Sequence, residues 1–251
     1  SPMCRLFGML AAEPITAQFW LLGAPDSVLD QSHRNPDGTG LAHYVGREPM
    51  LEKHPIAAHE DREFATEARQ VHSHLIVAHI RHATRGEPRL ENTQPFVHGS
   101  LVFAHNGTID GLEDLPASLG FFLGDTDSER YFALLHHHLG EAPDVLTGIQ
   151  KTLHWIEEHC TYTSLNFLLA DGDSLYALRL PGTEGLFVRR LKAREDLQGL
   201  SSYGTRTEGR NLTEAILFAS ERIDSASSWQ ELEPGTLAVA DRDLQLEFHS
   251  T

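Results

Sequence analysis

The sequence predicts an α+β fold in which helices cover β-sheets. Short apolar runs typical of strands gather towards both ends of the chain, and two long amphipathic helices are predicted between them. This order differs from the βαβ alternation of parallel α/β proteins. With 251 residues, of which 40% are hydrophobic, the chain is long enough to bury a large core. We expect residues 4–251 to form one domain, and residues 1–3 to be a remnant of an expression tag or a short propeptide.

The elements follow from local patterns. Strands are predicted at residues 4–10, 41–45, 75–80, 100–104, 164–170, 174–180, 185–190, 217–220, 236–240 and 244–248. Helices are predicted at residues 13–22, 61–71, 127–139 and 145–159, the first because Pro14 suits a first helical turn. Turn residues make 35–40 a loop and Asp171-Gly172-Asp173 a hairpin turn.

Composition narrows the class of protein. The formal net charge of −16 argues against a nucleic-acid groove or an anionic membrane surface as partner. No apolar run is long enough to span a membrane, and no signal peptide opens the sequence. The only cysteines, Cys4 and Cys160, cannot form a disulfide scaffold. These features predict a soluble, cytoplasmic protein.

Cys4 is the first candidate for chemistry. A chain that starts Met-Cys loses its initiator Met, which leaves Cys4 with a free α-amine. Such an amine has a pKa of about 7.7–8.0, so near neutral pH it can serve as a base beside its own thiol. The simpler interpretation of Cys4 is a buried cysteine in the first strand.

Three further segments carry groups that could act on a polar substrate. Arg81, after a predicted strand, could bind a carboxylate, although a solvated loop arginine is the simpler interpretation. Asn106 and Gly107 follow another strand and could form an oxyanion hole, or a simple turn. Within Gly124–Glu129, either Thr126 or Asp127 fits a helix N-cap, and a carboxylate there could instead hold an ammonium group.

Taken together and in this order, these segments resemble the class II glutamine amidotransferases, which have an N-terminal cysteine nucleophile. The matching segments are Met3–Gly8, Arg34–Gly40, His79–Thr84, Asn92–Phe96, His105–Gly107 and Thr126–Glu129. The later part of the chain is similar to the stand-alone members, which include proteins of unknown substrate and the γ-glutamyl hydrolase of ergothioneine synthesis. The position after Arg81, often aromatic in the family, is His82.

The resemblance implies a four-layer αββα fold of the Ntn-hydrolase type. It implies that Cys4 is the nucleophile and that Asn106 and Gly107 hold the oxyanion. The implied substrate-binding residues are Arg81 for the α-carboxylate of glutamine, Asp127 for its α-ammonium group, Thr84 near the carboxylate, and Arg34 near the cysteine. A pocket that reads both charged ends should discriminate against analogues that lack either one.

The resulting functional hypothesis is hydrolysis of the γ-amide of glutamine or of a γ-glutamyl conjugate through a thioester on Cys4. Three alternatives stay open: a glutaminase subunit that supplies ammonia to a separate synthase, a stand-alone hydrolase, and a non-catalytic γ-glutamyl-binding protein. A homodimer is compatible with each. No cofactor motif is present, and we expect no metal site, because the consecutive His136, His137 and His138 point about 100° apart on a helix.

Overall fold

Two antiparallel sheets form the centre of the computed structural model, which describes all residues except 1–3, 83–85, 121–122, 201–205 and 211. The first sheet has the order β15-β11-β14-β1-β4-β2-β3 and the second has the order β17-β16-β10-β9-β6-β5. The first consists of β1 (Arg5–Ile15), β2 (Thr39–Val45), β3 (Glu48–His54), β4 (Ser73–Ile80), β11 (Phe187–Leu191), β14 (Ala215–Ala219) and β15 (Gln230–Glu231). The second consists of β5 (Phe96–His98), β6 (Leu101–Asn106), β9 (Asn166–Ala170), β10 (Leu175–Arg179), β16 (Thr236–Ala240) and β17 (Leu246–Ser250).

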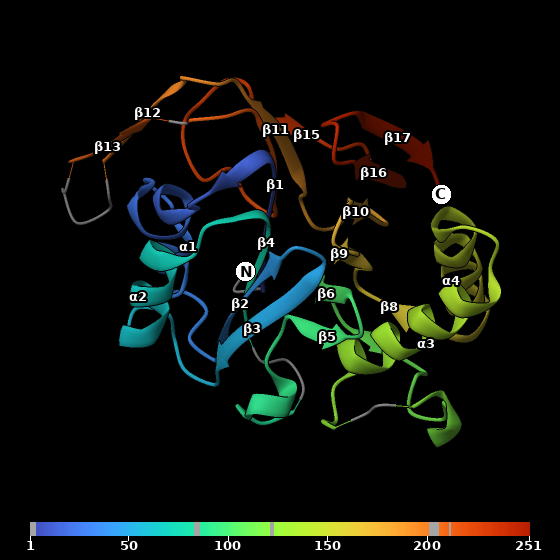
Figure 1. Ribbon diagram of the computed structural model, residues 1–251. Coiled ribbons are helices and arrows are strands. Elements are labelled where there is room, and N and C mark those ends of the chain that lie inside the picture. Colours follow the sequence, from blue (N-terminus) through green and yellow to red (C-terminus); the bar gives the residue numbers. More distant parts are fainter. Residues whose placement is uncertain (1–3, 83–85, 121–122, 201–205, 211) are drawn as a thin grey trace.

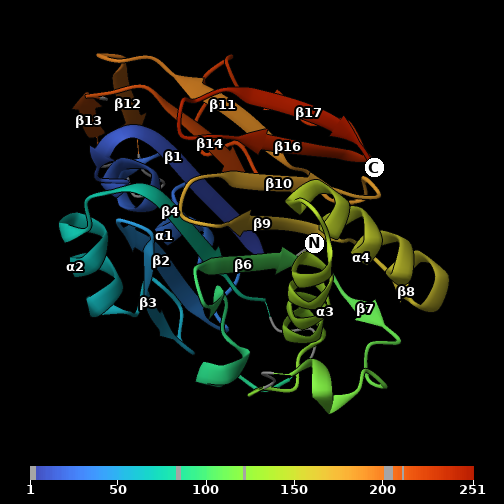
Figure 2. The ribbon, with the colours of Figure 1, turned by 45° about the vertical axis from the view of Figure 1, so that its right-hand side comes forward.

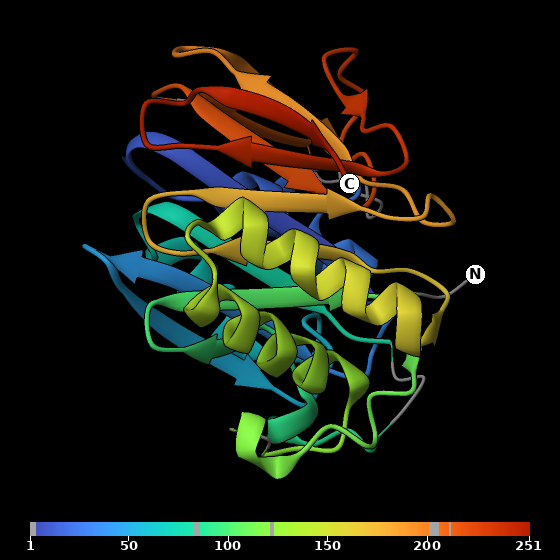
Figure 3. The same ribbon diagram turned by 90° about the vertical axis from the view of Figure 1, so that its right-hand side faces the viewer.

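Helices cover the outer face of each sheet, which gives four layers (Figure 1). The first sheet is covered by η1 (Phe19–Gly23), α1 (Val28–Gln31) and α2 (Arg62–Gln70). The second is covered by α3 (Asp127–Glu141) and α4 (Val145–His159), which lie side by side in Figure 3. The remaining short elements are η2 (Leu90–Asn92), η3 (Ala117–Leu119) and the paired strands β7 (Ile109–Asp110) with β8 (Thr161–Tyr162) and β12 (Asp196–Leu200) with β13 (Arg206–Arg210).

Three apolar layers hold these elements together. Met9 of β1 packs in the layer beneath η1 and α2, whereas its neighbour Leu10 packs between the two sheets. Successive strand residues point to opposite faces, so a strand buried on both faces appears as a continuous apolar run. Figure 2 shows β1 and β4 crossing behind β6 and β9. The predicted αββα sandwich is confirmed.

The longer helices begin at side-chain caps. The Asp61 carboxylate accepts hydrogen bonds from the Glu63 and Phe64 N–H groups at the start of α2. Thr126 caps α3, which selects it over Asp127 as the predicted N-cap. Asp144 caps α4. Each cap satisfies backbone donors that have no partner within the helix. No helix among the described residues is long and apolar enough to span a membrane.

The predicted helix over residues 13–22 is wrong in its first half. β1 continues to Ile15, where it pairs with Ser73 of β4 after a shift of register, and the helix η1 begins only at Phe19. The Ala12 N–H also donates to the Glu214 carbonyl, which keeps the strand extended. Pro14 lies in an exposed part of β1, where its missing N–H group is tolerated. Tertiary strand pairing therefore overrides the local helix signal.

Several strands were not predicted, namely β3, β5, β7, β8, β12, β13 and β15. β3 pairs with β2 along its whole length at the edge of the first sheet. Because its side chains are exposed or only partly buried, β3 has no apolar run that would mark it. The other missed strands are short or lie outside the main sheets.

Phe103 should be a main contributor to stability, because its ring is fully buried and contacts three other rings. The ring centroids of Phe132, Tyr131 and Phe167 lie 5.1, 5.2 and 5.5 Å from it. We expect Phe103→Ala to lower the free energy of unfolding by about 3–5 kcal/mol, measured by denaturant titration. The control Phe248→Ala removes a ring that is 53% exposed and should cost no more than about 1 kcal/mol. Equal losses would contradict the central position of Phe103.

Candidate active site

Antiparallel pairing brings two of the predicted site residues, Cys4 and Arg81, to one end of the first sheet. Arg5 of β1 pairs with Ile80 of β4, and Ile80 also pairs with Thr39 of β2. The start of β1, the end of β4 and the start of β2 therefore lie at the same end of the first sheet, where these strands begin or finish. In the second sheet, β6 ends at Asn106 and is followed by the Ile109 N–H group, which donates to Asp127 at the start of α3.

Cys4 lies directly before β1 and faces the end of β4. Its Sγ accepts a hydrogen bond from the His82 N–H at 3.3 Å, and the thiol donates to the His82 carbonyl oxygen at 3.4 Å. Burial raises the pKa of the Cys4 thiol to about 11, although the His82 N–H group and the charge of Arg81 act in the opposite direction. The thiol is therefore protonated at neutral pH, and a base is needed to activate it.

Arg81 is buried, with 3% of its surface exposed. Its Nη1 donates to the Glu87 carbonyl oxygen at 3.0 Å and its Nη2 to the Gly86 carbonyl oxygen at 2.9 Å. Burial lowers its pKa, and the nearby Cys4, Asp37, Asp125 and Asp127 oppose that effect. Arg81 thus lies within electrostatic range of both the thiol and Asp127. Thr84, the neighbouring residue predicted to bind the carboxylate, is outside the described residues.

Asp127 is the first residue of α3 and is mostly buried. Its Oδ2 accepts the Ile109 N–H hydrogen bond at 2.6 Å. Its charge reaches both Cys4 and Arg81. One cation and one anion therefore lie near the thiol, which is the arrangement predicted for the two charged ends of an amino acid.

Gly107 adopts a backbone conformation that only glycine tolerates here. Its φ is +147°, and a Cβ at this position would lie 2.0 Å from the Ser164 carbonyl oxygen. The same oxygen accepts a hydrogen bond from Nε2 of His105, whose Nδ1 accepts from Ser128. The strand end that presents Asn106 and Gly107 is therefore held from the side of α3.

Gln94 holds the same strand end from the other side. Its Oε1 accepts from the His105 N–H at 2.6 Å and its Nε2 donates to the His105 carbonyl oxygen at 3.2 Å. Gly40 packs directly on this segment, since a Cβ there would lie 2.1 Å from the Gln94 carbonyl oxygen. Gln94 and His105 lie within the matching sequence segments, but only the fold reveals that they support the strand end at Asn106.

A second set of contacts joins the segment after Arg81 to the segment before α3. The Glu129 carboxylate accepts from the Leu123 and Gly124 N–H groups at 2.7 and 2.8 Å. Asn92 accepts from the Asp125 N–H at 3.1 Å and donates to the Glu87 carbonyl oxygen at 3.1 Å. Both side chains stand within the matching segments Asn92–Phe96 and Thr126–Glu129, but neither was predicted as a site residue. The structure shows that both are buried polar residues with hydrogen-bond partners.

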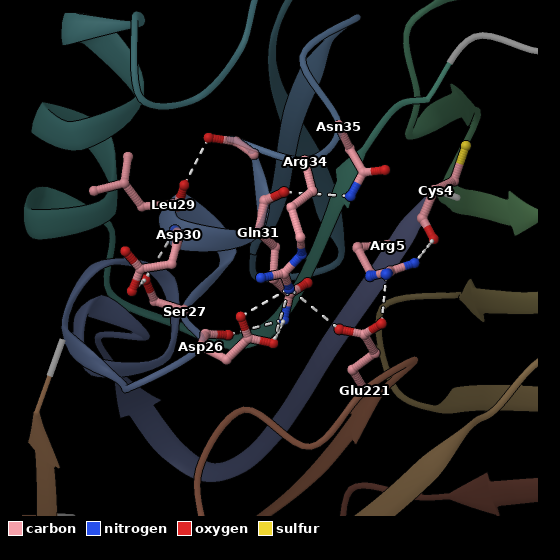
Figure 4. A network of polar contacts seen from close by, with 11 residues as sticks. Cys4, Arg5, Asp26, Ser27, Leu29, Asp30, Gln31, Arg34, Asn35 and Glu221 are labelled. Atoms are coloured by element: carbon pink, nitrogen blue, oxygen red, sulfur yellow. Dashed lines mark hydrogen bonds and ion pairs between the residues drawn. The ribbon is translucent and has the colours of Figure 1, made fainter. Parts of the chain in front are cut away.

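Arg34 forms ion pairs with two carboxylates. Its Nη2 contacts the Asp26 carboxylate at 2.8 and 3.1 Å and the Glu221 carboxylate at 3.4 Å (Figure 4). Its role in binding substrate stays a prediction. Within the described part of the chain, no group of three or more His, Cys, Asp or Glu side chains is arranged to hold a metal ion.

Comparison with known proteins identifies the family. The model of the class II glutamine amidotransferases matches residues 3–249. The chain belongs to this family. This class II amidotransferase is 30% identical over 188 residues to a Haemophilus influenzae protein named putative glutamine amidotransferase, and the match covers 70% of this chain and 62% of that one.

Two further comparisons cover nearly the whole chain of this class II amidotransferase. The Escherichia coli protein named putative glutamine amidotransferase YafJ is 26% identical over 248 residues, which cover 93% of this chain and 95% of YafJ. The glutamine phosphoribosylpyrophosphate amidotransferase of B. subtilis has the same fold, with a TM-score of 0.69 and 19% identity over 98% of this chain and 49% of that one. The Ntn-type fold is thereby confirmed.

The raised pKa of the partly buried Cys4 thiol predicts slow alkylation of the 251-residue chain. Because the pKa is raised to about 11, the thiolate fraction should rise about tenfold per pH unit up to at least about pH 10. The urea-unfolded chain should level off near pH 9, the ordinary range of a cysteine. Mass spectrometry of the peptide that contains Cys4, after timed iodoacetamide treatment, measures both rates. A folded-state profile that levels off near pH 9 would contradict the burial effect.

Proposed function

We propose that this class II glutamine amidotransferase hydrolyses the γ-amide of glutamine or of a small γ-glutamyl conjugate, with residues 4–251 acting as one domain. One observation carries the proposal: Cys4, Arg81 and Asp127 lie within electrostatic range of one another. They do so at one end of the sandwich, beside the end of β6. A thiol, a cation and an anion match the scissile amide, the α-carboxylate and the α-ammonium group of glutamine.

In the proposed reaction, Cys4 Sγ attacks the γ-carbonyl carbon and its proton passes to the Cys4 α-amine. The raised pKa of the Cys4 thiol supports the need for this base. The Asn106 side-chain amide and the Gly107 N–H group stabilise the oxyanion of the tetrahedral intermediate. Collapse of the intermediate breaks the C–N bond, and the α-ammonium group returns the proton to the departing ammonia or amine. Water then attacks the thioester, which releases glutamate and restores the thiol.

Substrate recognition in this scheme rests on Arg81 and Asp127. The Arg81 guanidinium now binds the carbonyl oxygens of Gly86 and Glu87, and those oxygens mark where a substrate carboxylate would compete for it. Thr84 is proposed to add a hydrogen bond near that carboxylate. Asp127 has one oxygen bound to the Ile109 N–H group, which leaves its second oxygen to receive the ammonium group.

The α-amine of Cys4 should decide activity. A protein that begins at Cys4 is expected to release glutamate from glutamine or from a γ-glutamyl amide, because its amine is free to act as base. The chain that retains residues 1–3 should be at least about 100-fold slower, since its Cys4 nitrogen is a peptide amide. Glutamate release is measured for both forms, after mass spectrometry has confirmed their N-termini.

The controls for this experiment are Cys4→Ala and a thioester trap. The form that begins at Cys4 is called the processed protein. In this form, Cys4→Ala should retain substrate binding and lose turnover. Hydroxylamine should divert the wild-type product to a γ-glutamyl hydroxamate. Full activity with residues 1–3 attached would contradict the role of the amine. Release of ammonia from glutamine, without comparable hydrolysis of conjugates, would favour the ammonia-supplying subunit over the stand-alone hydrolase.

Asp127 should bind the ammonium group of the substrate and so discriminate against analogues that lack it. We expect processed wild-type protein to hydrolyse glutamine about 100-fold more efficiently, in kcat/KM, than the deamino analogue that lacks the α-amine. Asp127→Asn should abolish most of this preference, while its amide oxygen still accepts the Ile109 N–H hydrogen bond. Asp114→Asn, an exposed carboxylate in the preceding segment, is the matched control and should keep the preference. Retained discrimination in Asp127→Asn would exclude this role.

A further inference from the structure

Four charged side chains of alternating sign form a continuous chain on the outer side of β1 (Figure 4). Arg5 forms an ion pair with Oε1 of Glu221, and Oε2 of Glu221 lies 3.4 Å from Nη2 of Arg34. Nη2 of Arg34 in turn lies 2.8 Å from Oδ1 of Asp26. Each carboxylate oxygen of Glu221 therefore faces a different guanidinium, so that Glu221 links the two arginines.

One end of this chain of charges reaches the backbone of Cys4. Nη1 of Arg5 donates to the Cys4 carbonyl oxygen at 3.3 Å. The Arg5 side chain is only 8% exposed, whereas that of Glu221 is 37% exposed. Beside them, the Leu6 N–H donates to the Ser220 Oγ and the Ser220 N–H donates to the Leu6 carbonyl oxygen, both at 3.0 Å. The end of β14 is thus fastened to β1 directly next to Cys4.

The other end is fixed to the segment around α1. Nε2 of Gln31 donates to the Asp26 backbone oxygen at 2.8 Å, which holds the loop that carries Asp26. Burial acts against the charged form of Arg34, but the hydrogen bond and the charge of Asp26, with Glu221 and Asp30, raise its pKa. The Arg34 guanidinium therefore stays charged, and the carboxylates on both sides of it hold it in place.

We propose that Arg5, Glu221 and Arg34 are positioning residues that fix the backbone of Cys4 and thereby the direction of its thiol and α-amine. The inference rests on the proposed function, in which Cys4 is the N-terminal nucleophile. It assigns a role to Arg5 and Glu221, and it makes Arg34 act through Glu221, without contact with the substrate.

A terminal nucleophile needs such support for a physical reason. Once the residues before Cys4 are removed, no chain on that side restrains it, and chain ends are poorly ordered unless they are tied down. Among the described residues, the His82 backbone contacts the thiol and the Arg5 guanidinium contacts the carbonyl oxygen of Cys4. A displacement of about 1 Å at a reacting atom can lower the rate about 100-fold. The ion pair that holds Arg5 therefore contributes to the rate of turnover by fixing the position of Cys4.

Glu221→Gln tests the proposal, with Glu231→Gln as a matched control. Glu231 is likewise half-exposed and pairs with a buried arginine, Arg179, at 2.9 Å. In the processed protein we expect Glu221→Gln to lower kcat about 10- to 100-fold with KM changed less than about threefold. In the 251-residue chain, alkylation of Cys4 at neutral pH should become about tenfold faster, because the thiol leaves the partly buried position in which its pKa is raised. Glu231→Gln should change neither quantity.

Arg34 separates positioning from substrate binding. Arg34→Gln is expected to lower kcat and leave KM nearly unchanged, and Arg34→Lys should restore much of the loss. The double variant with Glu221→Gln should be no slower than Glu221→Gln alone, because both changes break the same chain of ion pairs. A rise of KM as the main effect of Arg34→Gln would overturn the proposal in favour of direct binding.

The two readouts separate this inference from the proposed function. If wild-type protein turns over substrate and Glu221→Gln equals Glu231→Gln in both kcat and alkylation rate, the positioning role is overturned and the proposed function stands. If no γ-glutamyl amide is hydrolysed but Glu221→Gln alone speeds alkylation of Cys4, the positioning role stands and the proposed function fails.

Discussion

The antiparallel pairing of β1 with β4 is the constraint on which the candidate site depends. It places the residue before β1 against the residues that follow β4, so that the Cys4 thiol meets the His82 backbone. The same register places Arg81, which directly follows β4, at the end of the sheet where β2 begins. A shift of one residue would turn the alternating side chains of β1 to the opposite face, and Leu6 and Leu10 would leave the layer between the sheets. Core packing and active-site geometry are therefore fixed by one register.

Beyond the ends of the strands, polar side chains hold the backbone in place through hydrogen bonds. Gln94 and His105 hold the end of β6, whereas Asn92 and Glu129 hold the segments that follow Arg81 and precede α3. Gln94 satisfies buried backbone groups of His105, which would be costly to leave without partners in a protein interior. The loops can therefore remain irregular in conformation and still present a defined set of groups.

Electrostatics around the thiol differ from those of the molecule as a whole. The formal net charge is −16, yet two arginines, Arg81 and Arg5, lie near Cys4. Arg5 donates to the Cys4 carbonyl oxygen, while Arg81 is proposed to bind the substrate carboxylate. Burial disfavours the charged form of both kinds of group: it raises the pKa of the Cys4 thiol and lowers that of Arg81, and for Arg81 the nearby negative groups oppose the effect. In the proposed reaction, the α-amine of Cys4 activates the thiol.

Local patterns in the sequence determined the α+β class, the limits of α4 and, through motif order, the family and its candidate residues. They could do so because helical periodicity, turn chemistry and motif spacing are local properties. The extension of β1 through Ile15, the edge strand β3 and the ion pairs of Glu221 were decided only by the tertiary structure. Each depends on groups far apart in the chain: Glu221 lies 216 residues beyond Arg5 and still forms an ion pair with it. No local pattern encodes such a contact, because it exists only after β14 has paired with β1.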